Sequence, residues 1–480
     1  MAIPRNPSLP VDLLYVDLDG TLTPSDSLVE SLLALVRKRP STLLRLPGWL
    51  VRGRLHLKAQ VAAADVLEPD DLPYREDLLV DLRSWRAGGA ELVLATAAHE
   101  KTAAAVADHL GLFDSVLSSD EATNLSGHAK LAAIERHAGG RAYGYVGNAV
   151  VDVPILAAAD AAFITGPRAD VIRKRLSGPA QVEIYGETPR RGREYWRLMR
   201  PRHWLKNLLL FVPVLASQQV SRLSAIGAAA VAFVAFSLIA SGSYALNDVL
   251  DVHADRRHPV KAARPVAAGT ISVTAAIAFA LLLIGAGFAV AAFLPAGFTL
   301  VLGVYLGVSL LYSLVLKRLL LLDVVTLAAV FVLRVIAGAE AIEVTASFWL
   351  LAFSLFFFAS LALTKRCSEL HNLEGDADAV SHGRAYRAGD LAILQTIGAA
   401  AGVVSVLVLA LYIEDPASEA VYSRPELLWL LTPLLLYWIS RTWIKAGRGE
   451  LTEDPLLFAA SDAASWVVTL LSLAVILAAV

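Results

Sequence analysis

The feature that most constrains the fold is a series of nine apolar segments that fills the chain after residue 204. Most of them approach about 20 residues, the length of a helix that crosses a bilayer. They cover residues 205–218, 224–245, 271–293, 296–315, 320–338, 346–363, 391–412, 427–443 and 463–480. The alternative is that these segments are buried helices of a large soluble core, but nine such segments in succession exceed what soluble proteins contain. We therefore predict an all-α polytopic membrane domain with nine transmembrane helices.

Lys and Arg residues predict the orientation of these segments. They gather before the first segment and in the loops after the second, fourth, sixth and eighth, whereas the opposite loops hold only Arg222 and Arg424. Cationic flanks stay on the cytoplasmic side of a membrane. We therefore expect a multi-pass protein of the inner or plasma membrane, with its N-terminal region in the cytoplasm and its C-terminus outside.

Composition excludes several other classes of protein. Hydrophobic residues make up 56% of the 480 residues and charged residues 18%, which excludes a disordered chain and an ordinary soluble enzyme. Because 42 Lys and Arg residues nearly balance 44 Asp and Glu residues, we expect membrane lipids and no nucleic acid as partners. The single cysteine, Cys367, excludes an intramolecular disulfide bond.

The first part of the chain has the pattern of a soluble α/β domain. Short apolar runs end in small or polar residues, and helical stretches such as residues 99–112 lie between them. The runs are residues 13–16, 92–94, 143–146 and 162–164. Strands that alternate with helices indicate a mostly parallel sheet. We expect three parts: the α/β domain over residues 1–185, a basic linker on the membrane surface over 186–204, and the membrane domain over 205–480.

Two carboxylates follow the first apolar run, in the sequence DLDGT at residues 17–21. Asp17 and Asp19 can converge on one metal ion and one phosphorus atom, because α/β sheets bind ligands at the carboxyl ends of their strands. One carboxylate can attack phosphorus while a second moves the proton. Three more polar residues follow in order along the chain, namely Thr96, Lys130 and Asp152.

These motifs together resemble the haloacid dehalogenase phosphatase superfamily over about residues 11–170. The resemblance implies a Rossmann-like fold with a nucleophile, an acid/base, two phosphate-binding residues and three positions on Mg²⁺. The nucleophile would be Asp17 and the acid/base would be Asp19. Thr96 and Lys130 would bind the phosphate, and Asp17, Asp19 and Asp152 would bind Mg²⁺. The fourth motif departs from the family, because Asn148 stands where an aspartate is usual. A neutral amide binds Mg²⁺ more weakly than a carboxylate does, so the catalytic activity of this domain stays open.

An aspartate-rich sequence, NDxxDxxxD, follows the second apolar segment. The spacing of Asp248, Asp251 and Asp255 predicts that the three carboxylates share one helix face. Aligned carboxylates repel one another unless a cation lies among them, and Mg²⁺ commonly takes one or two carboxylates together with substrate phosphates. Lys261 and Arg264 add positive charge for those phosphates. The alternative is a solvated loop without a ligand.

This signature and the apolar segments resemble the UbiA superfamily of intramembrane transferases over about residues 195–480. Members hold a diphosphate through Mg²⁺ and join it to an acceptor, and one of the two substrates is a polyprenyl lipid. The resemblance implies that Asp248 and Asp251 are catalytic and that they bind Mg²⁺ together with Asp255. Prenyltransferases of this superfamily usually carry a second D-x3-D motif, whereas this chain has the single Asp323 there, after Lys317 and Arg318.

Several stretches are similar to the decaprenyl-phosphate phosphoribosyltransferases, which move phosphoribose from phosphoribosyl pyrophosphate to a polyprenyl phosphate. The stretches are residues 200–207, 247–269, 312–317, 333–338 and 365–371. This resemblance and the positive charges predict a substrate-binding set of Lys206, Asn247, Lys261, Arg264, Tyr312, Lys317, Asp323, Arg334, Lys365 and Arg366. Arg334 is the most telling, because a charge inside a membrane segment is costly. The alternatives are a structural ion pair for Arg334 and membrane anchoring for Lys317, Arg318, Lys365 and Arg366.

The presence of both domains in one chain leaves three functions open. In the first, the membrane domain makes a polyprenyl-phosphoryl phosphoribose and the phosphatase domain removes its 5-phosphate. In the second, a prenyl group moves from a prenyl diphosphate to an aromatic or other small acceptor, which the single Asp323 disfavours. In the third, the N-terminal domain is degenerate and has a regulatory role, which Asn148 favours. Lipid length and a homo-oligomeric state stay open as well.

Overall fold

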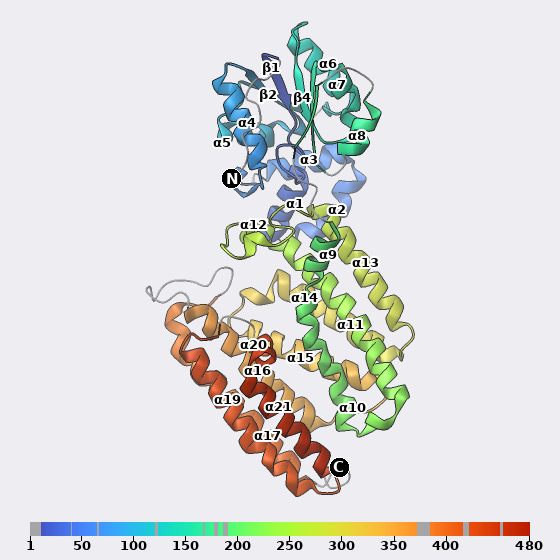
Figure 1. The fold of residues 1–480 in the computed structure, drawn as a ribbon, viewed down its shortest axis with the longest axis vertical. Coiled ribbons are helices and arrows are strands. Elements are labelled where there is room, and N and C mark those ends of the chain that lie inside the picture. Colours follow the sequence, from blue (N-terminus) through green and yellow to red (C-terminus); the bar gives the residue numbers. More distant parts are fainter. Residues whose placement is uncertain are drawn as a thin grey trace. The chain divides into compact units, whose positions relative to one another are not determined.

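The computed structural model divides the chain into two compact units (Figure 1). The first comprises Met1–Leu198 and Asp248–Phe279, and the second comprises Met199–Asn247 and Ala280–Val480. The aspartate-rich loop therefore groups with the N-terminal residues. The structure describes residues 11–39, 41–64, 67–120, 123–166, 169–176, 181–185, 191–371, 385–415, 422–451 and 455–480.

The predicted basic linker lies partly outside these described residues, at positions 186–190. Its continuation forms helix α9, Arg191–Met199. The domain boundaries that we expect from the sequence stay a prediction.

A six-stranded parallel sheet forms the centre of the first unit. Its strand order is β3-β2-β1-β4-β5-β6, so that β1 pairs with both β2 and β4. The strands are β1 Leu13–Val16, β2 Glu91–His99, β3 Ser115–Ser119, β4 Gly144–Gly147, β5 Ala161–Thr165 and β6 Gln181–Tyr185. The predicted α/β domain with a parallel sheet is confirmed. The carboxyl ends of the central strands meet at one edge, where ligands bind in such sheets.

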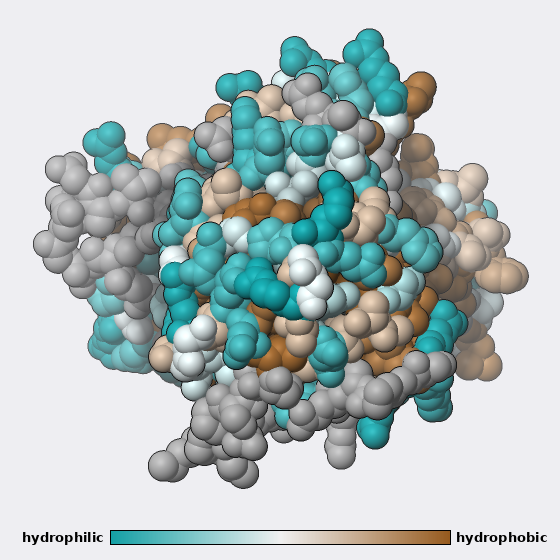
Figure 2. All heavy atoms as spheres, turned by 90° about the horizontal axis from the view of Figure 1, so that it is seen from above, coloured by the Kyte–Doolittle hydropathy of each residue, from teal (hydrophilic) through white to brown (hydrophobic). Residues whose placement is uncertain are grey.

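Helices pack on both faces of this sheet because neighbouring side chains of a strand point to opposite sides. Leu14 and Val16 pack toward α4 and α5, whereas Leu13 and Tyr15 pack toward α6, α7 and α8. The helices are α4 Glu76–Ala87, α5 Glu100–Leu110, α6 His128–Ala138, α7 Val153–Ala158 and α8 Ala169–Arg175. Figure 2 shows the face of the molecule seen from above, where hydrophilic side chains predominate and apolar patches lie between them.

Three more helices are inserted between β1 and α4. They are α1 Ser27–Lys38, α2 Thr42–Val51 and α3 Arg54–Ala63, and Figure 1 shows them together beyond one end of the sheet. Helix α1 begins at Ser27 because the Asp26 side chain accepts hydrogen bonds from the backbone N–H groups of Leu28 and Val29. The insertion thus follows directly on the DLDGT sequence.

The second unit consists of helices. Within the described residues, seven helices are long and apolar enough to cross a membrane, and a bent pair supplies an eighth candidate. Five of the spans are α11 Leu223–Leu250, α13 Val273–Ala291, α14 Ala296–Leu314, α15 Leu322–Ala341 and α16 Phe348–His371. The other two are Ala388–Ile413, which contains α17 Leu391–Ile413, and Pro425–Gly447, which contains α19 Leu431–Gly447. The bent pair is α20 Pro455–Ser461 and α21 Ala463–Ala479, with an angle of 86° between them.

Nine transmembrane helices are therefore not confirmed. The first predicted segment forms the 3₁₀ helix η3, Pro201–Phe211, followed by the short helix α10, Val212–Ala216. Pro201 and Pro213 lie at the starts of these two helices, where a residue without a backbone N–H interrupts a longer α-helix. The last predicted segment forms α21, and the bend lies before it, where the Asp462 carboxylate caps α21 and accepts a hydrogen bond from Ser465 N at 2.9 Å.

Helix η3 packs closely on α15 at Gly338. A Cβ atom at this glycine would lie only 2.3 Å from the carbonyl oxygen of Leu210, so a larger residue does not fit. The close approach brings Asn207 of η3 against Arg334 of α15. Local packing of these two helices thus builds one of the polar clusters described below.

Candidate functional site

The predicted phosphate site lies in the loops that follow β1 and β4. Asp17 comes directly after β1 and is 6% exposed, and Lys130 of α6 is 3% exposed. Lys130 Nζ donates a hydrogen bond to Asp17 Oδ1 at 2.9 Å and lies 3.9 Å from Asp152 Oδ1. The fold thus brings three of the predicted residues together from positions far apart in the sequence.

Negative charge exceeds positive charge at this point. Burial raises the pKa of Asp17 to about 6; Lys130 opposes this shift and Asp152 adds to it. Two carboxylates that face one cation, together with phosphate oxygens, are a ligand set that Mg²⁺ commonly takes. Asp17 and Asp152 therefore fit the metal that the resemblance implies.

Asp19 is held at the start of α1. Its Oδ1 accepts a hydrogen bond from the backbone N–H of Ser27 at 2.7 Å. Burial, followed by the neighbouring carboxylate of Asp26, raises the pKa of Asp19 to about 7. A carboxyl group that titrates near neutral pH can both give and take a proton, so its position suits the expected acid/base.

Thr96 lies within β2, and Asn148 comes directly after β4, on the other side of β1 in the sheet. Thr96 is fully buried, and its hydroxyl accepts a hydrogen bond from Ala98 N at 3.0 Å. Strand β2 continues past Thr96 to His99. Asn148 Oδ1 accepts a hydrogen bond from the Thr21 hydroxyl at 3.2 Å, and it packs so closely on Gly20 that a Cβ atom there would lie 1.9 Å from Asn148 Nδ2.

Lys58 is a polar residue of this region that the sequence did not indicate. It lies on α3 of the inserted helices, and its Nζ donates hydrogen bonds to the Ala97 carbonyl at 2.7 Å and to Asn124 Oδ1 at 2.8 Å. A cation is thereby held next to Thr96. No local motif marks Lys58, because its partners are 39 and 66 residues away in the sequence.

The aspartate-rich loop breaks where the sequence predicts one continuous helix face. Helix α11 ends at Leu250 and α12 spans Val252–Arg256, with Asp251 as the capping residue between them. The three aspartates therefore do not lie on one continuous helix. Arg264 nevertheless joins two of the three carboxylates, because its Nη1 lies 3.2 Å from Asp248 Oδ1 and 2.5 Å from Asp255 Oδ2.

The carboxylates that Arg264 joins are both buried. Burial raises the pKa of Asp255, Arg264 opposes the shift, and Asp248 and Asp251 add to it. Within the described parts of the chain, no three or more His, Cys, Asp or Glu residues lie close enough to hold a metal by themselves. The converging pair suits Mg²⁺ when substrate phosphates and water complete its ligands.

Arg334 lies buried in the second unit, among aromatic rings. Its guanidinium lies 5.0–5.3 Å from the ring centres of Phe236, Tyr305 and Phe331. Its Nε donates to Asn207 Oδ1 at 2.9 Å, and its Nη atoms donate to the Val330 carbonyl at 2.7 Å and the Tyr305 hydroxyl at 3.2 Å. These partners differ from the ion pair considered as the alternative, because they are neutral. Lys206 joins the cluster, with its Nζ 5.5 Å from the centre of the Phe331 ring.

A second buried cluster surrounds Arg366. Its Nε donates to Asp323 Oδ2 at 2.7 Å, and its Nη atoms donate to Glu369 Oε2 at 2.8 Å and the Tyr312 hydroxyl at 3.1 Å. The other oxygen of Asp323 accepts a hydrogen bond from the Tyr386 hydroxyl. Asp323 is 0% exposed and Arg366 is 1% exposed. Both oxygens of the single acid in the second loop are therefore bonded to protein groups.

The other predicted substrate-binding residues lie at helix ends and in short 3₁₀ turns. Asn247 lies in the last turn of α11, and Lys365 lies near the end of α16. Lys261 is the first residue of the turn Lys261–Ala263, and Lys317 is the middle residue of the turn Leu316–Arg318. Lys261 is exposed, and the other three are partly exposed. Their roles in binding stay predictions.

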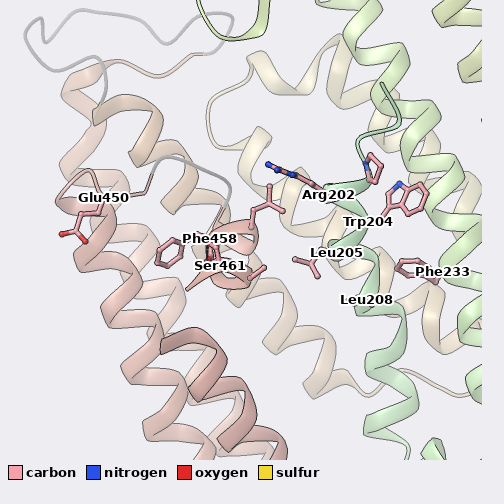
Figure 3. Close-up of a pocket in the computed structure, with 11 residues that line it drawn as sticks. Arg202, Trp204, Leu205, Leu208, Phe233, Glu450, Phe458 and Ser461 are labelled. Atoms are coloured by element: carbon pink, nitrogen blue, oxygen red, sulfur yellow. Dashed lines mark hydrogen bonds between the residues drawn. The ribbon is translucent and has the colours of Figure 1, made fainter. Parts of the chain in front are cut away.

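A hollow of about 830 Å³ opens beside η3 in the second unit (Figure 3). Its lining is largely apolar and consists of Pro201, Arg202, Trp204, Leu205, Leu208, Phe233, Glu450, Leu457, Phe458, Ala460 and Ser461. Figure 3 shows Arg202 extending from η3 toward the side of the hollow that α20 forms, while the Glu450 carboxylate points away from it. An apolar hollow beside one cation suits a lipid chain with an anionic head.

Comparisons with known proteins agree on both halves of the chain. Residues 208–468 match the family model described as the UbiA prenyltransferase family. Residues 14–157 match the model described as haloacid dehalogenase-like hydrolase.

Some individual proteins match both halves of the chain, and others match the membrane half alone. An uncharacterized protein of Sinorhizobium fredii, y4nM, is 35% identical over 460 residues, covering 95% of this chain and 88% of the relative. The decaprenyl-phosphate phosphoribosyltransferase of Mycolicibacterium smegmatis is 35% identical over 213 residues, covering 43% of this chain and 67% of the relative. A solved UbiA homolog from Archaeoglobus fulgidus bound to DMAPP and Mg²⁺ is 18% identical, with a TM-score of 0.47 over 59% of this chain and 99% of that one.

Proposed function

Because the chain belongs to the UbiA prenyltransferase family and carries a haloacid dehalogenase-like domain, we propose that it transfers phosphoribose to a polyprenyl phosphate and then removes the 5-phosphate. The first step takes phosphoribosyl pyrophosphate as the donor, as the name of the M. smegmatis relative suggests. Both steps take place at the cytoplasmic face, which the positions of the Lys and Arg residues favour.

The observation that carries this proposal is the bonding of Asp323. A prenyl diphosphate transferase of this superfamily would use acids in the second loop for another Mg²⁺. Here the one acid is fully buried, and both of its oxygens are bonded, to Arg366 and Tyr386. One acidic loop, together with the buried guanidinium groups of Arg334 and Arg366, suits a donor with a single diphosphate and a second anionic substrate.

In the transfer step, an oxygen of the lipid phosphate attacks C1 of the ribose. The bond from C1 to the pyrophosphate oxygen breaks, and pyrophosphate leaves with the electron pair. Asp248 and Asp255 are the residues that would hold Mg²⁺, which would supply neutralising charge for the diphosphate when bound. Arg264, which lies between these carboxylates, would bind and orient phosphate oxygens.

In the second step, a carboxylate oxygen of Asp17 attacks the phosphorus of the ribose 5-phosphate. The bond between phosphorus and the ribose oxygen breaks, and that oxygen takes a proton from Asp19. Water then attacks the phosphorus of the aspartyl phosphate while Asp19 takes up its proton, which releases phosphate and restores Asp17. Lys130, which is bonded to Asp17, would stabilise the phosphate oxygens.

The test uses the purified full chain in detergent with polyprenyl phosphate and phosphoribosyl pyrophosphate labelled in the ribose. We expect label to enter the lipid phase with Mg²⁺ and to fall to background with EDTA. Mass analysis of the lipid then reports whether the 5-phosphate is present. If no label enters a lipid that is shown to be competent with another transferase, the proposal is wrong. Prenyl diphosphates with aromatic acceptors would then be tested next.

The hollow beside η3 provides a test of where the lipid binds. We expect Leu208→Trp, which fills the hollow, to raise the KM for the lipid about tenfold with little change in kcat, because the lost binding is equal in the ground and transition states. The KM for the donor should not change. Leu215→Trp is the matched control, because Leu215 is also exposed but does not line the hollow. Equal effects of the two variants would contradict this assignment.

A further inference from the structure

One buried acid of the N-terminal domain has no part in either step of the proposed chemistry. Glu30 lies in the first turn of α1 and is 0% exposed. Its two carboxylate oxygens face the aspartate-rich loop. Arg256 Nη2 donates to Oε1 at 2.7 Å and Nη1 donates to Oε2 at 3.1 Å, while His253 Nε2 lies 2.8 Å from Oε2.

This contact is charge-assisted, and it is largely shielded from water because Glu30 and His253 are buried and the Arg256 side chain is only 10% exposed. Burial alone would raise the pKa of Glu30, but the hydrogen bonds from His253 and Arg256 outweigh it and lower the pKa to about 2. Glu30 is therefore ionised at neutral pH. A buried carboxylate held by both arms of a guanidinium fixes the orientation of its partner as well as its distance. Loss of the acid would leave the arginine buried without its counter-charge.

The residues that Glu30 holds lie on the helix that carries the expected metal ligands. His253 and Arg256 both belong to α12, which also contains Asp255 and begins directly after Asp251. Arg256 further donates to the carbonyls of Asp71 at 2.6 Å and Ala267 at 3.2 Å. Arg256 therefore joins α12 both to Asp71 of the N-terminal residues and to Ala267 in the loop that follows α12.

The same carboxylate of Glu30 is also bonded to the loop of the phosphate site. The Ser25 hydroxyl donates a hydrogen bond to Glu30. Ser27, at the start of the same helix, donates its N–H to Asp19. One helical turn of α1 thus contacts a residue of the expected phosphatase site and the loop of the expected transferase site.

We propose that Glu30 is a positioning residue for the transferase, through which the N-terminal domain holds α12 so that Asp255 meets Asp248 across the substrate diphosphate. The role of Asp255 rests on the proposed function, whereas the hold on α12 does not. The N-terminal domain then contributes to transfer through its structure as well as by acting on the product.

The same loop offers a matched control. Arg257, next to Arg256, pairs with Glu68, and both side chains are about 60% exposed. Exposed ion pairs contribute little to stability. Glu68→Gln therefore removes the same chemical group, a carboxylate that pairs with an arginine of the same loop, without removing the buried contact.

The experiment measures hydrogen–deuterium exchange of the full chain in detergent for wild type, Glu30→Gln and Glu68→Gln. We expect amides of α12 to exchange about tenfold faster or more in Glu30→Gln and at the wild-type rate in Glu68→Gln. Helices α4 and α5, in the core of the same unit, should stay protected in all three. Unchanged exchange of α12 in Glu30→Gln would overturn the proposal.

A second variant covers the case in which Glu30→Gln loosens the whole unit. Arg256→Lys keeps the charge but loses the two-armed contact, so α12 should again exchange faster while α4 and α5 stay slow. Loss of protection throughout the unit in both variants would overturn the proposal, because Glu30 would then stabilise the domain rather than position α12.

Transfer assays separate this inference from the proposed function. In Glu30→Gln we expect the Mg²⁺ concentration for half-maximal transfer to rise about tenfold, with a smaller change in kcat at saturating Mg²⁺. Faster exchange of α12 together with no transfer by the wild type would contradict the proposed function alone. Wild-type transfer together with an unchanged Mg²⁺ requirement in Glu30→Gln would contradict the role of Glu30 alone.

Discussion

Replacing Asp17 with asparagine should leave the ribose 5-phosphate on the lipid product. An amide does not attack phosphorus as a carboxylate does, so we expect phosphate release to fall about 10³-fold or more. The rate of label transfer from the donor into the lipid should stay within about twofold, because the variant lies in a different site. Mass analysis of the lipid measures both results in one reaction, since the two products differ by one phosphate group.

Asp170→Asn is the control for this variant, because Asp170 is an exposed acid of the same domain. It should release phosphate at the wild-type rate. Formation of dephosphorylated lipid by Asp17→Asn as fast as by wild type would show that the domain is not the phosphatase. If the wild type itself releases no phosphate, the degenerate domain that Asn148 favours becomes the better interpretation, and the transferase proposal stands unaffected.

Local sequence patterns predicted the elements whose signal lies within a few residues. The apolar run at Leu13–Val16 is strand β1 at the same bounds, and seven of the apolar segments correspond to single long helices. Strands β3 and β6 escaped notice because SVLSS and QVEIY are short and half polar. The break at Asp251 could not be predicted from the spacing of the three aspartates, because that spacing describes a helix face only if the helix continues.

The residues of the candidate sites show the same distinction: some belong to local motifs, and others do not. Asp17, Lys130 and Asp152 could be grouped because each belongs to a recognisable motif, and the fold does bring them together. Glu30 and Lys58 carry no motif. The partner of Glu30 in α12 is 223 residues away, and pairing over such a distance depends on the assembled unit rather than on any local pattern.

Replacing Arg366 with methionine should have the largest effect on stability. The change leaves Asp323 buried without its counter-charge, which costs about 3–5 kcal/mol. We therefore expect Arg366→Met to be recovered as little or no monodisperse protein from detergent. The double variant Arg366→Met/Asp323→Leu removes both charges from the buried site, and replacing a whole buried ion pair by apolar residues is often neutral. It should regain its fold and its elution as a single species.

The regained fold then separates structure from binding. If Arg366 also meets an anionic substrate, as we propose, the double variant should be folded but should transfer less than about 1% of the wild-type label, because a charge-assisted contact to phosphate is lost. Arg448→Met is the control, since Arg448 lies 3.8 Å from Glu450 in an exposed pair whose loss should cost less than about 1 kcal/mol. A double variant that transfers label at the wild-type rate would assign Arg366 to the fold alone. Among the residues that the structure describes in the second unit, Arg334 and Lys206 would then be the buried cations left to bind substrate phosphate.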